Sequence, residues 1–129
     1  MTGCDSALYL AQEGKKVTIV EALPEIAGDL NFISRGGLME KLTENGVNVL
    51  PNMTIREFTD EGLLAADREG NEQILKADTV ILALGAKSEN RLAKDLRDTV
   101  LELYEIGDCV SPRRIGEAIH EGFVTGWQI

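Results

Sequence analysis

The chain has 129 residues, of which 43% are hydrophobic and 27% are charged, and its formal net charge is −9. This length suits one domain with a core, and the composition is typical of a soluble globular protein. The negative charge argues against nucleic acid or an anionic membrane surface as a partner, because either would repel it.

No apolar run reaches the roughly 20 residues of a transmembrane helix, and the N-terminus lacks a signal-peptide pattern. The two cysteines, Cys4 and Cys109, lie far apart, without a C-x-x-C pair or flanking histidines. This spacing excludes a metal cluster held within the chain. We therefore expect a reduced, cytoplasmic protein with no metal site.

A glycine-initiated helix and an apolar strand form the first recognisable unit. Residues 6–13 are good helix formers, and Gly14 stands where helices commonly end. Residues 17–21 read Val-Thr-Ile-Val-Glu, which predicts a strand buried on both faces of a parallel sheet. Gly3 before the helix and Glu21 after the strand resemble the second half of a dinucleotide-binding βαβ unit, whose first strand and other glycines are not present.

The next elements continue this α/β pattern. Residues 22–36 are rich in turn residues and are predicted to form a loop. Residues 38–44 are predicted to be a helix, ended by Asn45-Gly46. Residues 47–50 follow as a second strand.

The pattern then changes to short strands separated by turns. Residues 54–58, 63–66 and 72–75 predict a three-stranded antiparallel meander. Residues 79–85, Thr-Val-Ile-Leu-Ala-Leu-Gly, are the most apolar segment, and we predict a central strand there. The fold class is therefore α/β, a Rossmann-like and mostly parallel sheet with an attached antiparallel meander.

The C-terminal part adds two helices and one strand to this prediction. Residues 90–96 suggest a short polar helix, and residues 103–106 suggest a last strand that runs into Gly107-Asp108-Cys109. Apolar and small residues recur at helical spacing over residues 115–126, which indicates a helix that packs closely on another element.

Four segments together resemble one family. They are G-C-D-S-A-L-Y-L-A from Gly3, V-T-I-V-E from Val17, T-V-I-L-A-L-G-A from Thr79, and Y-x-I-G-D-C-x-x-P-R-R-I-x-x-A-I-H-E-G-F from Tyr104. The chain is similar over nearly its whole length to the C-terminal dinucleotide-binding region of the NADH:flavin oxidoreductases, which include 2,4-dienoyl-CoA reductase and 2-enoate reductase. The G-D-C-x-x-P-R-R signature is the most specific part of this resemblance.

The resemblance implies roles for five residues. Gly3 would line the pyrophosphate of the nicotinamide dinucleotide, Glu21 would hold its adenosine ribose, and Gly85 would close over the same nucleotide. Gly107 and Asp108 would belong to the flavin half, where the aspartate holds the ribityl chain of FAD. In such enzymes a separate barrel carries FMN, an iron–sulfur cluster and the substrate site, so the barrel is the implied partner and no catalytic residue is expected in this chain.

The residues also allow plainer interpretations. Gly3 could be a glycine near a frayed end, Glu21 a solvated charge, and Asp108 an ordinary turn aspartate. His120, the only histidine, suits a surface or packing position better than a catalytic one. A non-catalytic folded module that binds no dinucleotide tightly is therefore the alternative, and the missing C-x-x-C counts against a thioredoxin-reductase-like enzyme.

In domain terms we predict one truncated dinucleotide-binding domain over 1–129, with an NAD-binding half at 1–85 and the end of an FAD-binding half at 86–129. We expect NADH to be preferred over NADPH, and the isolated chain to show neither turnover nor a coloured cofactor. Because one strand of the family sheet is lacking, we predict that residues 104–106 replace it between 17–21 and 80–84. Strand exchange in a homodimer is the alternative.

Overall fold

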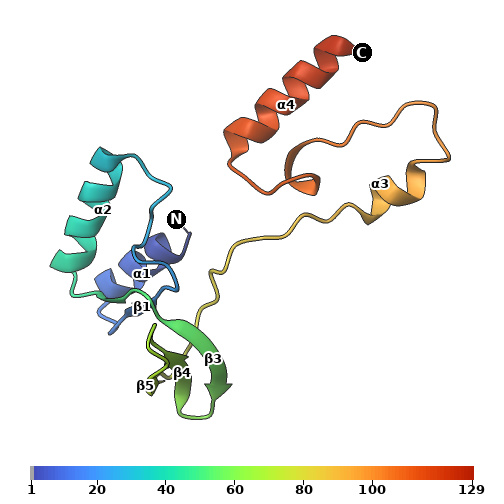
Figure 1. The fold of residues 1–129 in the computed structure, drawn as a ribbon. Helices are drawn as coiled ribbons and strands as arrows, with labels where there is room; N and C mark the ends of the chain where they lie inside the picture. The colour runs from blue at the N-terminus through green and yellow to red at the C-terminus, as the bar shows by residue number, and fades with distance from the viewer. Residues whose placement is uncertain (1) are drawn as a thin grey trace. The chain divides into compact units, whose positions relative to one another are not determined.

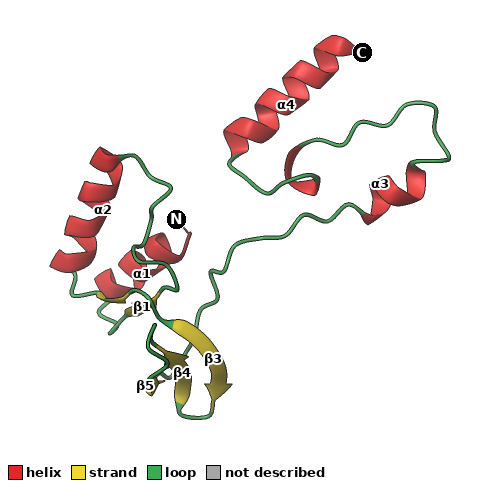
Figure 2. Ribbon diagram, viewed as in Figure 1, coloured by secondary structure: helices red, strands yellow, loops and turns green. Residues whose placement is uncertain are grey.

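The computed structural model describes residues 2–129, which divide into two compact units. One unit ends at Ala83 and the other spans Leu84–Ile129. Figure 1 shows the order of the elements along the chain, and Figure 2 shows that the strands belong to its N-terminal part. No helix within residues 2–129 has both the length and the apolar character to cross a membrane.

The first unit begins with two helices that alternate with two strands. They are α1 (Thr2–Gln12), β1 (Thr18–Val20), α2 (Phe32–Glu44) and β2 (Asn48–Leu50). The two strands pair in parallel, so the carboxyl ends of both lie at the same edge. This pair and the sheet that follows confirm the predicted α/β class, with a parallel part and an antiparallel part.

The core of this unit is formed by apolar side chains of both helices and both strands. Leu42 of α2 is its most deeply buried large side chain, with 1% of its surface exposed. The strand at residues 17–21 is not buried on both faces as predicted, because Thr18 is exposed and Ile19 and Val20 are only half-buried. The buried members of the core cluster are Cys4, Ala7, Ile26, Leu42 and Val47.

Helix α2 begins well before the predicted position. Asn31 caps it, since its side-chain oxygen accepts a hydrogen bond of 2.9 Å from the Ser34 N–H. The prediction of a loop up to residue 36 was therefore wrong. Each glycine of the Gly36-Gly37 pair costs about 1 kcal/mol inside a helix, but the cap and the packing of Leu38 and Leu42 on the core compensate. The end at Asn45-Gly46 is confirmed.

The antiparallel meander is confirmed. It consists of β3 (Thr54–Thr59), β4 (Gly62–Ala66) and β5 (Glu72–Lys76), with β4 in the middle. Strand β4 is buried except for Leu64. At the β3–β4 turn Gly62 has a φ of +140°, and a β-carbon built there would lie 2.2 Å from the carbonyl oxygen of Leu75, so the turn requires glycine.

The predicted central strand at residues 79–85 was wrong. These residues form no helix or strand, and Ile81, Leu82 and Leu84 are each more than half exposed. A strand needs neighbours that accept and donate its backbone hydrogen bonds. The described chain pairs no strand with this segment, so its apolar composition alone does not produce a strand.

The second unit contains α3 (Arg91–Leu96), the 3₁₀ helix η1 (Gly107–Cys109) and α4 (Ile115–Gln128). The helix predicted at 90–96 is confirmed, and so is the final helix. The strand predicted at 103–106 was wrong, since these residues have no regular structure. The predicted repair of the sheet by residues 104–106 was wrong for the same reason, and strand exchange between two chains stays a prediction.

Candidate functional site

Glu21 lies at the carboxyl edge of the parallel pair, just beyond β1. Its N–H donates to the carbonyl of Leu50 at 3.0 Å, and its own carbonyl accepts from the N–H of Met53 at 2.9 Å. Its side-chain Oε1 accepts a hydrogen bond of 2.9 Å from the N–H of Leu23. These bonds hold a half-buried carboxylate at the edge where ligands bind in open α/β sheets.

Gly3 lies in the first turn of α1, where it allows a close approach. A β-carbon built on Gly3 would lie 2.9 Å from the β-carbon of Ala83, a separation that real β-carbons essentially never show. The missing side chain therefore lets the last residue of the first unit pack directly against the start of the helix.

The first turn of α1 and Glu21 share one electrostatic environment. Burial raises the pKa of the Cys4 thiol, and the carboxylates of Asp5, Glu21 and Asp29 add to that effect. Cys4 itself is a buried, free thiol that packs in the core.

Gly85 belongs to the second unit and lies in an irregular segment with a φ of +87°. The two residues after it, Ala86 and Lys87, line an open pocket of about 310 Å³ together with Asp108. Gly85 therefore immediately precedes two of the residues that line this pocket. The remaining residues that line the pocket are Glu89, Cys109 and Pro112.

Gly107 and Asp108 form the start of η1. Gly107 is buried, has a φ of +70°, and accepts hydrogen bonds of 3.1 Å on its carbonyl from the N–H groups of Val110 and Ser111. A β-carbon on Gly107 would lie 3.6 Å from the β-carbon of Ala118 on α4. Asp108 is exposed, and its Oδ1 accepts a 3.3 Å hydrogen bond from the Arg113 N–H.

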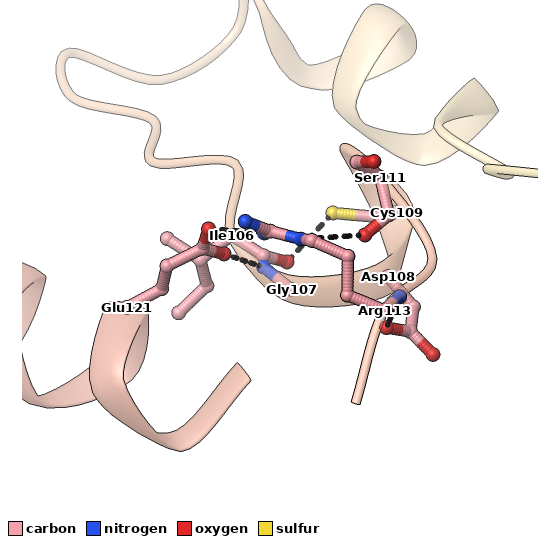
Figure 3. A network of polar contacts seen from close by, with 7 residues as sticks. All are labelled: Ile106, Gly107, Asp108, Cys109, Ser111, Arg113 and Glu121. Atoms are coloured by element: carbon pink, nitrogen blue, oxygen red, sulfur yellow. Dashed lines mark hydrogen bonds and ion pairs between the residues drawn. The ribbon is translucent and has the colours of Figure 1, made fainter. Parts of the chain in front are cut away.

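A polar network connects this turn to helix α4 (Figure 3). The N–H of Gly107 donates to Oε2 of Glu121 at 2.7 Å, and Nη2 of Arg113 pairs with Oε1 of the same carboxylate. The Nε of Arg113 also donates to the carbonyl of Ser111 at 3.2 Å. The Arg113 guanidinium, and next the Gly107 N–H, hold the pKa of the Glu121 carboxyl below its usual value.

The sequence pattern did not single out Glu121. Its partner Arg113 stands eight residues earlier in the chain, across a loop. Only the spatial return of α4 onto η1 reveals the pair. The small residues of α4 did indicate that this helix packs closely on another element. Ala118 faces Gly107, and a β-carbon on Gly122 would lie 3.9 Å from Cδ1 of Ile106.

Within residues 2–129 no group of three or more histidine, cysteine, aspartate or glutamate side chains is arranged to hold a metal ion. His120 is exposed on α4. The Glu21 and Asp108 carboxylates offer hydrogen-bond acceptors, and Gly3 and Gly107 allow close packing beside them.

Parallel strands alternating with helices, with a carboxylate held at the carboxyl edge, place the first unit in the class of α/β proteins whose ligands bind at that edge of the sheet. The chain belongs to the pyridine nucleotide-disulphide oxidoreductase family, whose sequence profile matches residues 1–122.

Similar proteins refine this assignment. An NADH oxidase of Thermoanaerobacter brockii is 37% identical over 130 residues, which cover 100% of this chain and 20% of the oxidase. A cinnamate reductase of Clostridium sporogenes is 32% identical over 126 residues, 95% of this chain and 19% of the reductase. The predicted kinship with flavin oxidoreductases is thereby confirmed, and the chain spans about a fifth of the length of these relatives.

A solved structure supports the same conclusion. A 2-naphthoyl-CoA reductase in complex with 2-naphthoyl-CoA superimposes with a TM-score of 0.85 at 31% identity. The match covers 98% of this chain and 19% of that reductase.

Proposed function

We propose that this chain is a nucleotide-binding part of an NADH-dependent flavin oxidoreductase. In the complete enzyme the bound NADH supplies a hydride and the bound FAD accepts it. This chain's own residues bind and orient the two cofactors. Residues 1–85 are the NAD-binding half and residues 86–129 the end of the FAD-binding half, with an FMN-carrying barrel as the partner in the longer protein.

The observation that carries the proposal is the Glu21 carboxylate, held at the carboxyl edge of the parallel pair β1–β2 that follows helix α1. A ribose presents hydroxyl groups that donate to a carboxylate, and a pyrophosphate is stabilised by the N–H groups and dipole of a helix N-terminus. Gly3 lies in that first turn, where Ala83 packs against it at the position that a side chain would occupy.

The charges around Glu21 favour NADH over NADPH. A 2′-phosphate next to Glu21 would meet a negative charge, and an arginine is the usual group that accommodates it. Arg35 is engaged elsewhere, since it pairs with Glu25 at 2.9 Å and its Nε donates to the Ile26 carbonyl at 3.1 Å.

For the flavin, the supporting feature is the exposed Asp108 carboxylate at the pocket that Ala86 and Lys87 also line. A carboxylate accepts hydrogen bonds from the hydroxyl groups of a ribityl chain. Gly107 suits this role because its φ of +70° turns the backbone sharply at the pocket, and Gly85 precedes the segment on the other side of it.

The test is calorimetric titration of the purified chain with NADH, NADPH and FAD. The proposal expects NADH to bind more tightly than NADPH, and FAD binding to weaken in Asp108→Asn but not in the control Asp95→Asn on α3. If none of the three ligands binds, the alternative holds, namely a folded module without dinucleotide affinity. The absorption spectrum of the chain as purified is a further check, and a flavin band retained through gel filtration would contradict the expected lack of a resident cofactor.

A further inference from the structure

Glu121 uses both carboxylate oxygens to hold the turn that carries Asp108. Oε2 accepts from the Gly107 N–H at 2.7 Å, and Oε1 pairs with Nη2 of Arg113. Figure 3 shows the Glu121 side chain reaching from α4 to the start of the turn. One residue on a helix thus contacts both the first residue of the turn and the arginine that follows it.

Arg113 extends this contact to the rest of the turn. Its backbone N–H donates to Oδ1 of Asp108 at 3.3 Å, and its Nε donates to the Ser111 carbonyl at 3.2 Å. The Arg113 and Glu121 side chains are 39% and 30% exposed, so solvent screens their ion pair only in part. The network therefore fixes the backbone on both sides of Asp108.

We infer that Glu121 is a positioning residue for the flavin site, acting through Gly107 and Arg113 to hold the Asp108 carboxylate at the pocket. The flavin part of this inference rests on the function proposed above. A carboxylate on a turn binds a polyol tightly only if the turn is already ordered before the ligand arrives. Otherwise part of the binding free energy is lost to the entropy cost of ordering the turn.

Packing alone does not account for this arrangement. Helix α4 contacts the turn through Ala118 and Gly122, which bring the backbones close without any charge. The ionisable groups near Glu121 include the Arg113 guanidinium, the neighbouring His120 on α4, and Asp108 on the other side of Arg113. Arg113 and the Gly107 N–H contact the carboxylate directly, and both belong to the turn or to the loop that follows it, so removal of the carboxylate is expected to affect the turn more than the helix.

The experiment uses the whole chain and compares Glu121→Ala, Glu121→Gln and the control Glu117→Gln, an exposed glutamate one turn earlier on α4. Amide hydrogen exchange followed by NMR gives the first readout. Exchange at Gly107 is expected to accelerate about tenfold in Glu121→Ala, the usual effect of losing a hydrogen bond to a charged group. Glu121→Gln keeps an oxygen acceptor and should restore part of the protection, and Glu117→Gln should match the parent chain.

The second readout is a pH titration. In the parent chain the Gly107 amide shift should follow a carboxyl titration below the ordinary glutamate range, and in Glu121→Gln this titration should disappear. Equal exchange rates at Gly107 in Glu121→Ala and the parent chain would overturn the inference. So would a uniform acceleration over all of α4, since that would mean that Glu121 only stabilises the helix.

FAD titration separates this inference from the proposed function. The affinity for FAD is expected to fall about tenfold in Glu121→Ala and less in Glu121→Gln, with no change in Glu117→Gln. If the parent chain binds no FAD at all, the proposed flavin role of Asp108 fails and the flavin part of the inference fails with it. If FAD binds the parent and Glu121→Ala equally while Gly107 exchange differs, the inference alone is overturned.

Discussion

Gly3 and Ala83, which stand 80 positions apart, touch at the start of helix α1. A β-carbon on Gly3 would lie 2.9 Å from the β-carbon of Ala83. The contact packs the irregular apolar segment that ends the first unit against helix α1. The first turn of this helix is the one that we propose to face a pyrophosphate. It gives Gly3 a packing role in addition to any contact with a ligand.

Replacing Gly3 by alanine is therefore expected to destabilise the first unit by about 1–3 kcal/mol, because Ala83 must move away from the added methyl group. Denaturant unfolding followed by the NMR signals of β1 and β2 measures this change. Gly36→Ala is the matched control, since Gly36 lies in α2 with nothing within 4 Å of the added atom; it should be neutral or stabilising by up to about 1 kcal/mol. In the double variant Gly3→Ala/Ala83→Gly most of the lost stability should return.

Replacing Glu21 by alanine should reduce the discrimination between NADH and NADPH. The carboxylate repels a 2′-phosphate, and its loss should narrow the ratio of the two dissociation constants by up to about tenfold. The exposed Glu13 provides the control, because Glu13→Ala removes the same charge in the turn just after α1. Tighter binding of NADPH than NADH by the parent chain would show that Glu21 does not have this role.

The β3–β4 turn provides a test of the meander. Gly62→Ala places a methyl group 2.2 Å from the Leu75 carbonyl oxygen, so we expect a loss of at least about 2 kcal/mol in the stability of the meander. Gly70→Ala in the β4–β5 turn is the control. Gly70 also has a positive φ, +88°, but has open space around it, so only backbone strain of about 1 kcal/mol applies. Hydrogen exchange of the β4 amides compares the two variants.

Acid should loosen the β4–β5 turn through Asp67. The Asn71 side-chain amide first, and then the Asn71 and Glu69 N–H groups, hold the pKa of the Asp67 carboxyl below its ordinary value of 3.8. Because the folded-state pKa is the lower one, this stabilisation is fully present above pH 3.8 and is lost as the pH falls through the folded value. NMR titration should show the Asn71 amide shifting below pH 3.8. The shift should be absent in Asp67→Asn and retained in Asp60→Asn; a titration at or above the ordinary value would contradict the proposed contacts.

Features set by neighbouring residues could be predicted from the sequence alone. The three strands of the meander are separated by Asp60-Glu61-Gly62 and Glu69-Gly70-Asn71, and such turns determine where a chain reverses. The end of α2 at Asn45-Gly46 follows from the same local chemistry. The G-D-C-x-x-P-R-R signature was sufficient to predict the family, because a motif of fixed spacing depends on sequence and not on long-range packing.

Features that depend on distant partners were decided by the tertiary structure. Residues 79–85 have the composition of a central strand, but a strand forms only where neighbours complete its hydrogen bonds, and the described chain pairs none with them. The contact of Gly3 with Ala83 and that of Glu121 with Gly107 likewise join residues whose spacing carries no periodic signal. The propensity for a helix, strand or turn depends on adjacent residues. Whether a backbone group or a carboxylate finds a hydrogen-bond partner depends instead on which segments the fold brings together.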